Sequence, residues 1–349
     1  MTLKRKNSGV FPSDLKVGIL FNQPTTPVKG EDLDYVAEAE VEDQVEIVQK
    51  ALEKLGFINH CFPLRDEITD LISSLKSQKP DVIINLCESA FGDSQLEMDV
   101  PSILELLGIP YTGSPPLTLG LCQNKGLTKN ILKANQILTP PFQILTELKD
   151  WRKSMSYPLF VKPLGEGGSL GISRKSLVRN DGELSAQVEY IIKSYDQPAL
   201  VEEYIDGREL NVAILGNKEP QCLPISEILF EFLDEPKIVD YSAKWLKESE
   251  EYQKTVPACP AELDFLLAQQ VETVALRAYR LLRCRDYARV DMRLRDNVAY
   301  VLEVNPNPDI SLESGFVRSL SAAGIPFEGF VGKIISFALE RKHGADSKP

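Results

Sequence analysis

The stretch 298–309, VAYVLEVNPNPD, restricts the fold more than any other part of the chain. Its first residues are β-branched and aromatic, which predicts a strand. Alternate residues of a strand share one face, so Glu303 and Asn305 are expected to point the same way. The prolines that follow cannot donate hydrogen bonds to a neighbouring strand, so pairing should end there. The sequence therefore predicts two oxygen-bearing side chains at one strand end.

A second strand with polar residues, ARVDMRL, precedes this stretch at 288–294. Arg289 and Asp291 share one of its faces, so the four polar side chains converge if the two strands pair. Carboxylate and amide oxygens suit Mg²⁺, a hard cation that prefers oxygen ligands. Asp291, Glu303 and Asn305 are therefore our candidate metal ligands. An exposed strand pair that carries surface salt bridges is the open alternative.

Composition excludes several classes of function. A chain of 349 residues is expected to form two or three domains. The net charge of −12 argues against nucleic acid or an anionic membrane as the main partner, because both require a basic face. We find no apolar stretch of membrane-spanning length and no signal peptide, which predicts a cytoplasmic location. With only two histidines, zinc sites built on His and Ser-His-Asp catalysis are disfavoured.

The N-terminal third alternates between strand and helix patterns. Strands are predicted at 16–21 and 81–87, an amphipathic helix at 39–56 and a further helix in 99–110 that ends at Gly108. Such alternation predicts an open α/β layer. After residue 206 strand patterns dominate until a long helix leads into the two polar strands.

A glycine-rich loop, GEGGSLG at 165–171, follows a predicted strand that carries Lys162. Glycines let a backbone fold closely over phosphates and offer its N–H groups, while the lysine supplies a positive charge. The loop is neither a Walker A motif nor a GxGxxG that opens a helix, because the following ISRKSLV is typical of a strand. A hairpin turn between two strands is the alternative.

A cluster of acidic residues follows further along the chain. Glu202 and Glu203 lie at a predicted strand edge, where a carboxylate can accept from an adenine amino group or a ribose hydroxyl. Tyr204 and Ile205 can form an apolar slot for the base. A solvated acidic surface is the alternative.

The order Lys125, Lys162, GEGGSLG, EEYI, RVD, LEVN resembles the ATP-grasp superfamily, and most closely its D-alanine–D-alanine ligase branch. The segments IPYTGS, LVEEYIDGRELNVAIL, AKW and AAGIPFEGFV also stand where that family has comparable ones, so the resemblance covers almost the whole chain. It implies an α/β and α+β fold. Its parts would be an N-terminal open α/β (pre-ATP-grasp) domain over 1–112, a central ATP-grasp subdomain over 113–206 and a C-terminal ATP-grasp subdomain with the metal site over 207–349.

The resemblance also implies roles for individual residues. ATP would be bound by Lys125, Phe160, Lys162, Gly167, Gly168, Ser169, Ile172, Glu202, Glu203, Tyr204, Ile205, Glu209, Lys244 and Leu302. Asp291, Glu303 and Asn305 would hold Mg²⁺, as two ions. Arg289, Lys244 and Ser169 would be catalytic, with Arg289 beside both the transferred phosphoryl group and the substrate. This is coherent physically, because phosphoryl transfer needs positioning and charge neutralisation more than acid or base side chains.

Substrate residues follow the family pattern less closely. Glu38 keeps the family's spacing and would bind an α-ammonium group. The family links its glycine loop to a second loop through two hydroxyl groups, and Gly168 and Trp245 stand in their place, which predicts the loss of that hydrogen-bonded gate. Asp309 replaces a glycine, whereas Ser314 is kept to bind the second substrate's carboxylate. A carboxylate at Asp309 should repel an anionic second substrate or attract a cationic one.

We predict a Mg²⁺- and ATP-dependent carboxylate–amine ligase. It would join small-molecule amino acids or amino-acid-like metabolites in an amide bond through an acyl phosphate. The alternatives are a D-alanine–D-alanine ligase of cell-wall synthesis with a divergent substrate gate, and a non-catalytic ATP-binding protein. A homodimer is implied by the resemblance alone.

Overall fold

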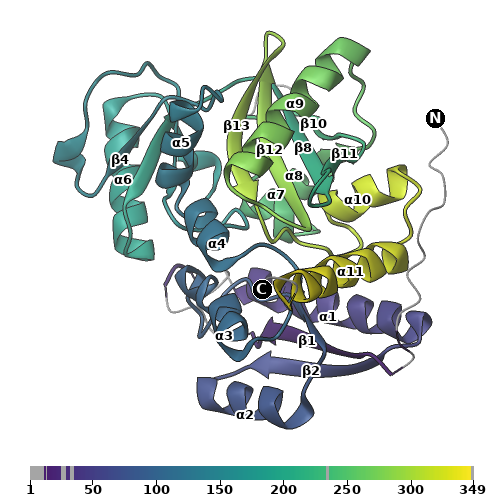
Figure 1. Cartoon of the computed structure of the whole chain (residues 1–349). Coiled ribbons are helices and arrows are strands. Elements are labelled where there is room, and N and C mark those ends of the chain that lie inside the picture. Colours follow the sequence, from purple (N-terminus) through teal and green to yellow (C-terminus); the bar gives the residue numbers. More distant parts are fainter. Residues whose placement is uncertain (1–11, 13, 25–28, 32–34, 233–235, 347–349) are drawn as a thin grey trace.

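The structure is a computed structural model that describes residues 12, 14–24, 29–31, 35–232 and 236–346, with side chains for all of these except 36–38 and 342–346. The described residues form three sheets. Figure 1 shows the two larger sheets side by side above the smaller N-terminal sheet. One parallel α/β layer and two antiparallel sheets confirm the predicted combination of α/β and α+β structure.

The N-terminal sheet is parallel and has the strand order β2-β1-β3. Its elements are β1 (Lys16–Asn22), α1 (Tyr35–Leu55), β2 (Ile58–Leu64), α2 (Ile68–Gln78), β3 (Val82–Asn85) and α3 (Asp99–Leu107). Successive residues of β1 face opposite sides of the sheet: Ile19 packs in the core beside α1, whereas Leu20 packs in the core beside α2 and α3. Helices therefore cover both faces, as a parallel sheet requires.

The central sheet is antiparallel, with the order β4-β7-β5-β6. Its elements and the two helices before it are α4 (Pro116–Gln123), α5 (Lys125–Ala134), β4 (Phe142–Leu145), β5 (Leu159–Pro163), β6 (Leu177–Val178), α6 (Asp181–Tyr195) and β7 (Ala199–Glu203). The glycine loop, residues 165–171, follows β5 as predicted. The strand expected directly after this loop is mostly wrong: only Leu177–Val178 pairs with β5, because Arg174–Ser176 forms a 3₁₀ turn capped by Ser173.

The C-terminal sheet has the order β11-β10-β8-β12-β13, with β9 paired to β8. Its elements are β8 (Arg208–Leu215), β9 (Gln221–Cys222), β10 (Ser226–Phe230), α7 (Tyr241–Trp245), α8 (Glu250–Gln253), β11 (Thr255–Ala258), α9 (Phe265–Leu281), β12 (Tyr287–Arg295), β13 (Val298–Asn305) and α10 (Gly315–Ala322). β12 and β13 are neighbours and antiparallel, and β13 ends directly before Pro306. The end of the strand at the prolines was predicted, and the pairing meets the condition on which the predicted convergence rested.

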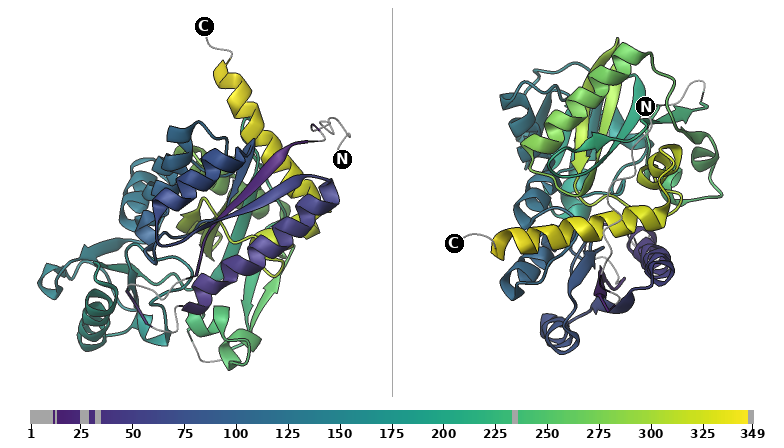
Figure 2. Two further views of the ribbon diagram at one scale, coloured as in Figure 1. Left: turned by 90° about the horizontal axis from the view of Figure 1, so that it is seen from below. Right: turned by 45° about the vertical axis from the view of Figure 1, so that its right-hand side comes forward.

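The last helix, α11 (Phe327–Asp346), returns to the N-terminal sheet (Figure 2). It contacts α1 and β3, and its Phe330 and Ile334 share one apolar core with Val17 of β1. Within the described ranges no single helix is both long and apolar enough to cross a membrane. Only α10 and residues 327–341 of α11 taken together have that length and composition, and they are bent by 105°. The predicted domain boundaries stay a prediction, although each sheet lies inside one of the three predicted ranges.

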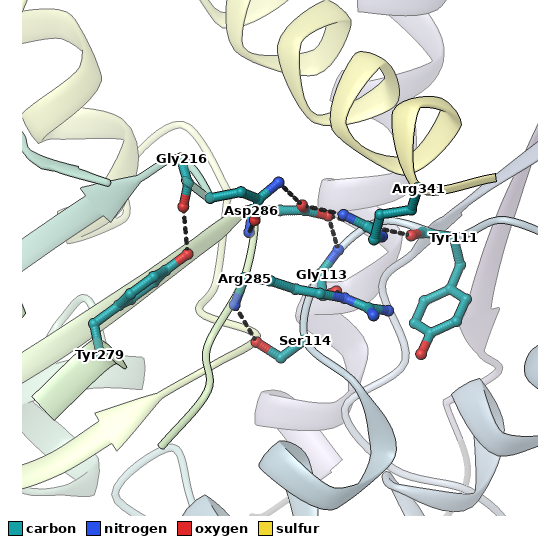
Figure 3. Close-up of polar contacts among 9 residues, drawn as sticks. Tyr111, Gly113, Ser114, Gly216, Tyr279, Arg285, Asp286 and Arg341 are labelled. Carbon is teal, nitrogen blue, oxygen red and sulfur yellow. Dashed lines mark hydrogen bonds and ion pairs between the residues drawn. The ribbon is translucent and has the colours of Figure 1, made fainter. Parts of the chain in front are cut away.

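Asp286 joins three parts of the chain (Figure 3). Its fully buried carboxylate accepts hydrogen bonds from the Gly113 N–H at 2.8 Å and from Asn217 Nδ2 at 2.9 Å. The Arg341 guanidinium of α11 donates to the same carboxylate at 2.8 Å and to the Tyr111 carbonyl at 2.5 Å. A buried charge is tolerated when it is paired and hydrogen-bonded in this way. These contacts hold the turn after β8, the loop between α3 and α4, and α11 against the start of β12.

We expect Asp286→Asn to lower the free energy of unfolding by about 3 kcal/mol, because it leaves Arg341 facing a neutral, buried partner. Asparagine tolerates the positive φ of 65° at this position, so backbone strain should not contribute. Urea-induced unfolding measures the loss. Asp296→Asn is the matched control, since Asp296 also has a positive φ (52°) but is exposed. It should change the free energy by less than about 0.5 kcal/mol, and equal losses in both variants would contradict this role of Asp286.

Candidate active site

A cavity of about 1240 Å³ is lined by residues from all three sheets and from the loops between them. The predicted site residues that line it are Lys125, Phe160, Lys162, Gly167, Gly168, Ser169, Ile172, Glu202, Glu203, Tyr204, Ile205, Glu209, Lys244, Trp245, Arg289, Asp291, Leu302, Glu303, Asn305, Asp309 and Ser314. The remaining one, Glu38, belongs to α1, but its side chain lies outside the described residues. The fold thus brings together every predicted side chain that it describes.

Glu202 binds two buried lysines at the floor of the cavity. Its Oε1 lies 2.9 Å from Lys162 Nζ of β5, and its Oε2 lies 2.7 Å from Lys129 Nζ of α5. All three residues are at most 5% exposed. Burial favours protonation of Glu202, but the two ammonium groups outweigh it and lower the pKa of Glu202 to about 2. Burial in turn lowers the pKa of Lys129 to about 8.

Sequence reasoning assigned Glu202 to the base or the ribose and did not identify Lys129. In the structure both Glu202 oxygens are engaged by lysines, so this carboxylate positions Lys162. The available signal for Lys129 was its spacing of four residues from Lys125, which places both lysines on one side of α5. Lys125 Nζ donates to the Glu166 carbonyl in the glycine loop.

The predicted convergence of β12 and β13 is confirmed. Asp291 pairs with Glu303 across the two strands, and Arg289 pairs with Asn305. The Asp291 carboxylate accepts two hydrogen bonds from Arg289, both at 2.8 Å, and one from Asn305 Nδ2 at 2.8 Å. Asn211 of β8, which sequence reasoning did not assign to the site, donates to it at 2.7 Å. Its position two residues after Glu209 was the signal, because both lie on the same face of β8.

The positive charges around this cluster lower the pKa of Glu303. Burial raises the pKa of Glu303, but Lys125, Lys162 and then Arg289 outweigh it, so the net pKa is below the usual range. Lys125 Nζ lies 3.9 Å from Glu303 Oε2. Asp291 in turn holds the pKa of Arg289 above its usual value despite burial.

The donor set fits Mg²⁺. In the part of the chain that the structure describes, no three His, Cys, Asp or Glu side chains form a metal site on their own. The cluster instead offers the Asp291 and Glu303 carboxylates with the amide oxygen of Asn305. In phosphoryl-transfer enzymes Mg²⁺ is usually bound by a few protein oxygens, and water and phosphate oxygens complete its coordination.

An apolar slot lies between the central and C-terminal sheets and is lined by Phe160, Ile172, Tyr204, Ile205 and Leu302. Arg293 of β12 closes one side of it. Its guanidinium is 2.5 Å from Glu209 and 5.7 Å from the Tyr204 ring centroid. Arg293 was not predicted, although it continues the alternation of Arg289 and Asp291 along β12. Glu203 lies at the rim, 3.0 Å from Arg295.

The glycine loop faces the α7–α8 segment, residues 236–253, across the cavity mouth. Trp245 Nε1 donates to the Gly168 carbonyl at 2.9 Å, and Ser169 Oγ donates to the Val239 carbonyl at 2.9 Å. The prediction that Gly168 and Trp245 abolish the hydrogen-bonded gate is therefore wrong for this pair. An indole can donate to a backbone carbonyl, which a glycine retains.

Carboxylates gather at the end of the cavity away from the apolar slot. Asp309 accepts hydrogen bonds from the Ser311 N–H at 2.7 Å and from Ser311 Oγ at 3.1 Å, and this hydroxyl lies 3.4 Å from Glu40 of α1. Burial and then the charge of Asp309 raise the pKa of Glu40 to about 8. Among the α1 carboxylates whose side chains are described, Glu40 is the one in contact with Ser311 beside Asp309. It is therefore placed to take the role predicted for Glu38. The role of Glu38 itself stays a prediction.

Three further residues differ from expectation. Burial raises the pKa of Glu97 to about 8, and Asn307 Nδ2 donates to Glu97 at 3.4 Å. Neither was predicted. Ser314, expected to bind a substrate carboxylate, lines the cavity and also caps α10 by accepting from the Val317 N–H at 3.2 Å.

Comparisons with known proteins extend over most of the chain. Residues 131–336 match the family model described as D-ala D-ala ligase C-terminus. The y4sG protein of Sinorhizobium fredii is 37% identical over 265 residues, which are 75% of this chain and 76% of that protein. The D-alanine–D-alanine ligase of Pseudothermotoga lettingae is 33% identical over 297 residues, 84% of this chain and 93% of the enzyme. The crystal structure of D-alanine–D-alanine ligase from Bacillus anthracis complexed with ATP matches with a TM-score of 0.75 at 26% identity. The match covers 95% of this chain and 99% of that chain.

We expect Glu202→Gln to lower the free energy of unfolding by about 3 kcal/mol, because two buried ammonium groups then lack a negative partner. The loss should be constant from neutral pH to about 4.5 and should shrink as the pH falls toward 2, where wild-type Glu202 also becomes neutral. Urea unfolding at several pH values measures it. Glu203→Gln is the matched control, since the side chains of Glu203 and Arg295 are 33% and 34% exposed. It should cost less than about 1 kcal/mol, and a cost equal to that of Glu202→Gln would contradict the assignment.

Proposed function

The chain belongs to the D-alanine–D-alanine ligase family and is an ATP-grasp ligase that forms carbon–nitrogen bonds, and from this we propose that it joins a small-molecule carboxylate to an amine at the expense of ATP. One observation carries the proposal. A single cavity brings buried lysines, an apolar slot, an oxygen-donor cluster and a carboxylate-rich end together. A reaction that activates an acid with a phosphoryl group and then lets an amine capture the activated acid requires each of these parts.

The nucleotide half of the proposal uses residues that are already positioned. The apolar slot suits a purine base, and Lys125, Lys162 and Lys244 place positive charge beside the glycine loop for the phosphates. Asp291, Glu303 and Asn305 would hold Mg²⁺, as two ions. When bound, the metal neutralises phosphate charge and orients the transferred group. Arg289 would stabilise negative charge on the phosphoryl group and on the substrate carbonyl oxygen.

The substrate half concerns the carboxylate-rich end. We propose amino acids or amino-acid-like substrates whose ammonium groups bind near Glu40 and Asp309. The carboxylate of one substrate would be activated as an acyl phosphate, which the amine of the other captures. Asp309 disfavours a second substrate that places its own carboxylate nearby. D-alanine for both positions is the second candidate, favoured by the names of relatives such as the Pseudothermotoga lettingae enzyme. The cytoplasmic location and the homodimer stay predictions.

A screen of ADP release over pairs of D- and L-amino acids, their amides and small carboxylic acids tests the proposal. We expect ADP release to require both an acid and an amine and to match amide formation one to one. Strong turnover with D-alanine alone would select the D-alanine–D-alanine ligase alternative. Binding of ATP without ADP release for any pair would instead support a non-catalytic nucleotide-binding protein and overturn the proposal.

We expect Glu303→Ala to lower kcat at least about 100-fold, because the cluster loses a metal ligand while Lys125 and Lys162 lose a nearby negative charge. Steady-state ADP release at saturating substrates measures it. The same substitution at exposed Glu340 of α11 is the matched control and should leave kcat within about twofold. Full activity of Glu303→Ala would overturn the metal-site assignment.

Glu40 should make substrate binding pH-dependent. Its pKa of about 8 means that it is protonated at neutral pH and gains its negative charge as the pH rises. We therefore expect the KM of the ammonium-bearing substrate to fall by up to about tenfold per pH unit between pH 6 and 8, and to level off above. Glu40→Gln should remove this dependence, which also separates it from titration of the amine itself. A dependence that persists in Glu40→Gln would contradict the role of Glu40.

A further inference from the structure

Asp309 and Glu40 face the same serine hydroxyl at the carboxylate-rich end of the cavity. Ser311 Oγ lies 3.1 Å from Asp309 Oδ2 and 3.4 Å from Glu40 Oε1. The Ser311 N–H also donates to Asp309 Oδ1 at 2.7 Å, which fixes the direction of this carboxylate. Within the described part of the chain Asp309 accepts hydrogen bonds from Ser311 alone, so it has lone pairs left for a substrate group.

Glu40 carries the proton of this pair at neutral pH. A serine hydroxyl has one hydrogen and can donate to only one of the two carboxylates at a time. A protonated Glu40 completes the chain, since it donates to Ser311 Oγ while Ser311 donates to Asp309. Burial and the charge of Asp309 raise the pKa of Glu40 to about 8, which agrees with this arrangement. Asp309 then holds the negative charge of the pair.

The charged groups around the pair place Asp309 near the reacting atoms. Lys244 and Glu88 act through their charges on Glu40. The charge of Asp309 acts on Arg289, the guanidinium that we assign to the phosphoryl group and the substrate carbonyl oxygen. Asp309 and Arg289 both line the cavity. An ionised carboxylate thus lies on the side of the cavity where an amine must approach the acyl carbon.

We propose that Asp309 is a catalytic residue, the general base that takes a proton from the attacking amine, and that Glu40 and Ser311 position it. This inference rests on the proposed ligase function. A substrate ammonium has no lone pair, so one N–H proton must first pass to the Asp309 carboxylate. The nitrogen pair then forms the C–N bond while the C–O bond of the acyl phosphate breaks. Phosphate leaves with the electron pair of that bond and with the second N–H proton.

Hydroxylamine separates a base from a group that only binds or shapes the site. It is uncharged at neutral pH and attacks an acyl phosphate without prior loss of a proton, giving a hydroxamate. Asp309→Asn removes the basic carboxylate but keeps an Oδ1 that can accept the Ser311 N–H. We expect it to lower the ratio of kcat for amide formation to kcat for hydroxamate formation about 100-fold, which is the contribution of a general base.

Both kcat values are measured on one enzyme preparation, with each nucleophile saturating and with the acid and amine that release most ADP in the screen. Losses in ATP binding, in acyl-phosphate formation or in the folded fraction affect both products and cancel in the ratio. Asp296→Asn is the matched control, because Asp296 lies in the turn between β12 and β13, outside the cavity lining. Its ratio should stay at the wild-type value. Asp309→Ala, which also lacks the carboxylate, should show the same fall and replaces Asp309→Asn if that variant does not fold.

The possible results separate the general base from the ligase function. A carboxylate that only binds the ammonium would raise the KM of the amine and leave the ratio of the two kcat values unchanged, and this result would overturn the proposal. The ligase function would then stand, because the wild type still makes amide and hydroxamate. If the wild type makes neither product with any acid, the ligase function fails and the general base fails with it.

Discussion

The arrangement of the cavity depends on the hydrogen bonds and the ion pair that the buried Asp286 carboxylate forms. This carboxylate accepts hydrogen bonds from Gly113 in the loop between α3 and α4, from Asn217 in the turn after β8 and from Arg341 of the last helix. The cavity is lined by side chains from α1, from the central sheet and from the C-terminal sheet, so its shape follows from how these parts are held. The core that α11 shares with β1 reinforces the same arrangement with apolar burial.

Charge compensation is the second constraint, and it links stability to function. Lys129 and Lys162 are buried at the cavity floor and tolerated because Glu202 binds both. A positive group fixed in this way needs no reorganisation when an anion arrives, which is how preorganised sites stabilise developing charge. Neighbouring cations likewise hold the pKa of Glu303 below its usual range, and Asp291 is hydrogen-bonded to Arg289, beside the proposed metal position. The residues that stabilise the folded chain are thus the ones that the proposed reaction requires.

Sequence reasoning was accurate where one element carries the information. The alternation of polar residues in 288–305 predicted that the polar side chains converge if the two strands pair, and the register of β12 and β13 confirms the convergence. It missed residues whose role depends on contact between two separate elements. Lys129 looks like an ordinary helix lysine until β7 places Glu202 beside it, and Arg293 gains a role only when β8 supplies Glu209. The contact of Trp245 with a backbone carbonyl was missed because a carbonyl has no identity in a sequence.

The sequence by itself determined the secondary structure of the polar strands, the glycine loop, the family and the oxygen-rich composition of the site. These follow from side-chain periodicity and from the limits that proline and glycine place on the backbone, which are local properties. Only the tertiary structure decided which charges neutralise one another, that Glu40 of α1 lies beside Ser311 and Asp309, and how the loops close. Those outcomes depend on distances of a few ångströms between residues far apart in the chain, and electrostatic and hydrogen-bond energies change steeply over such distances.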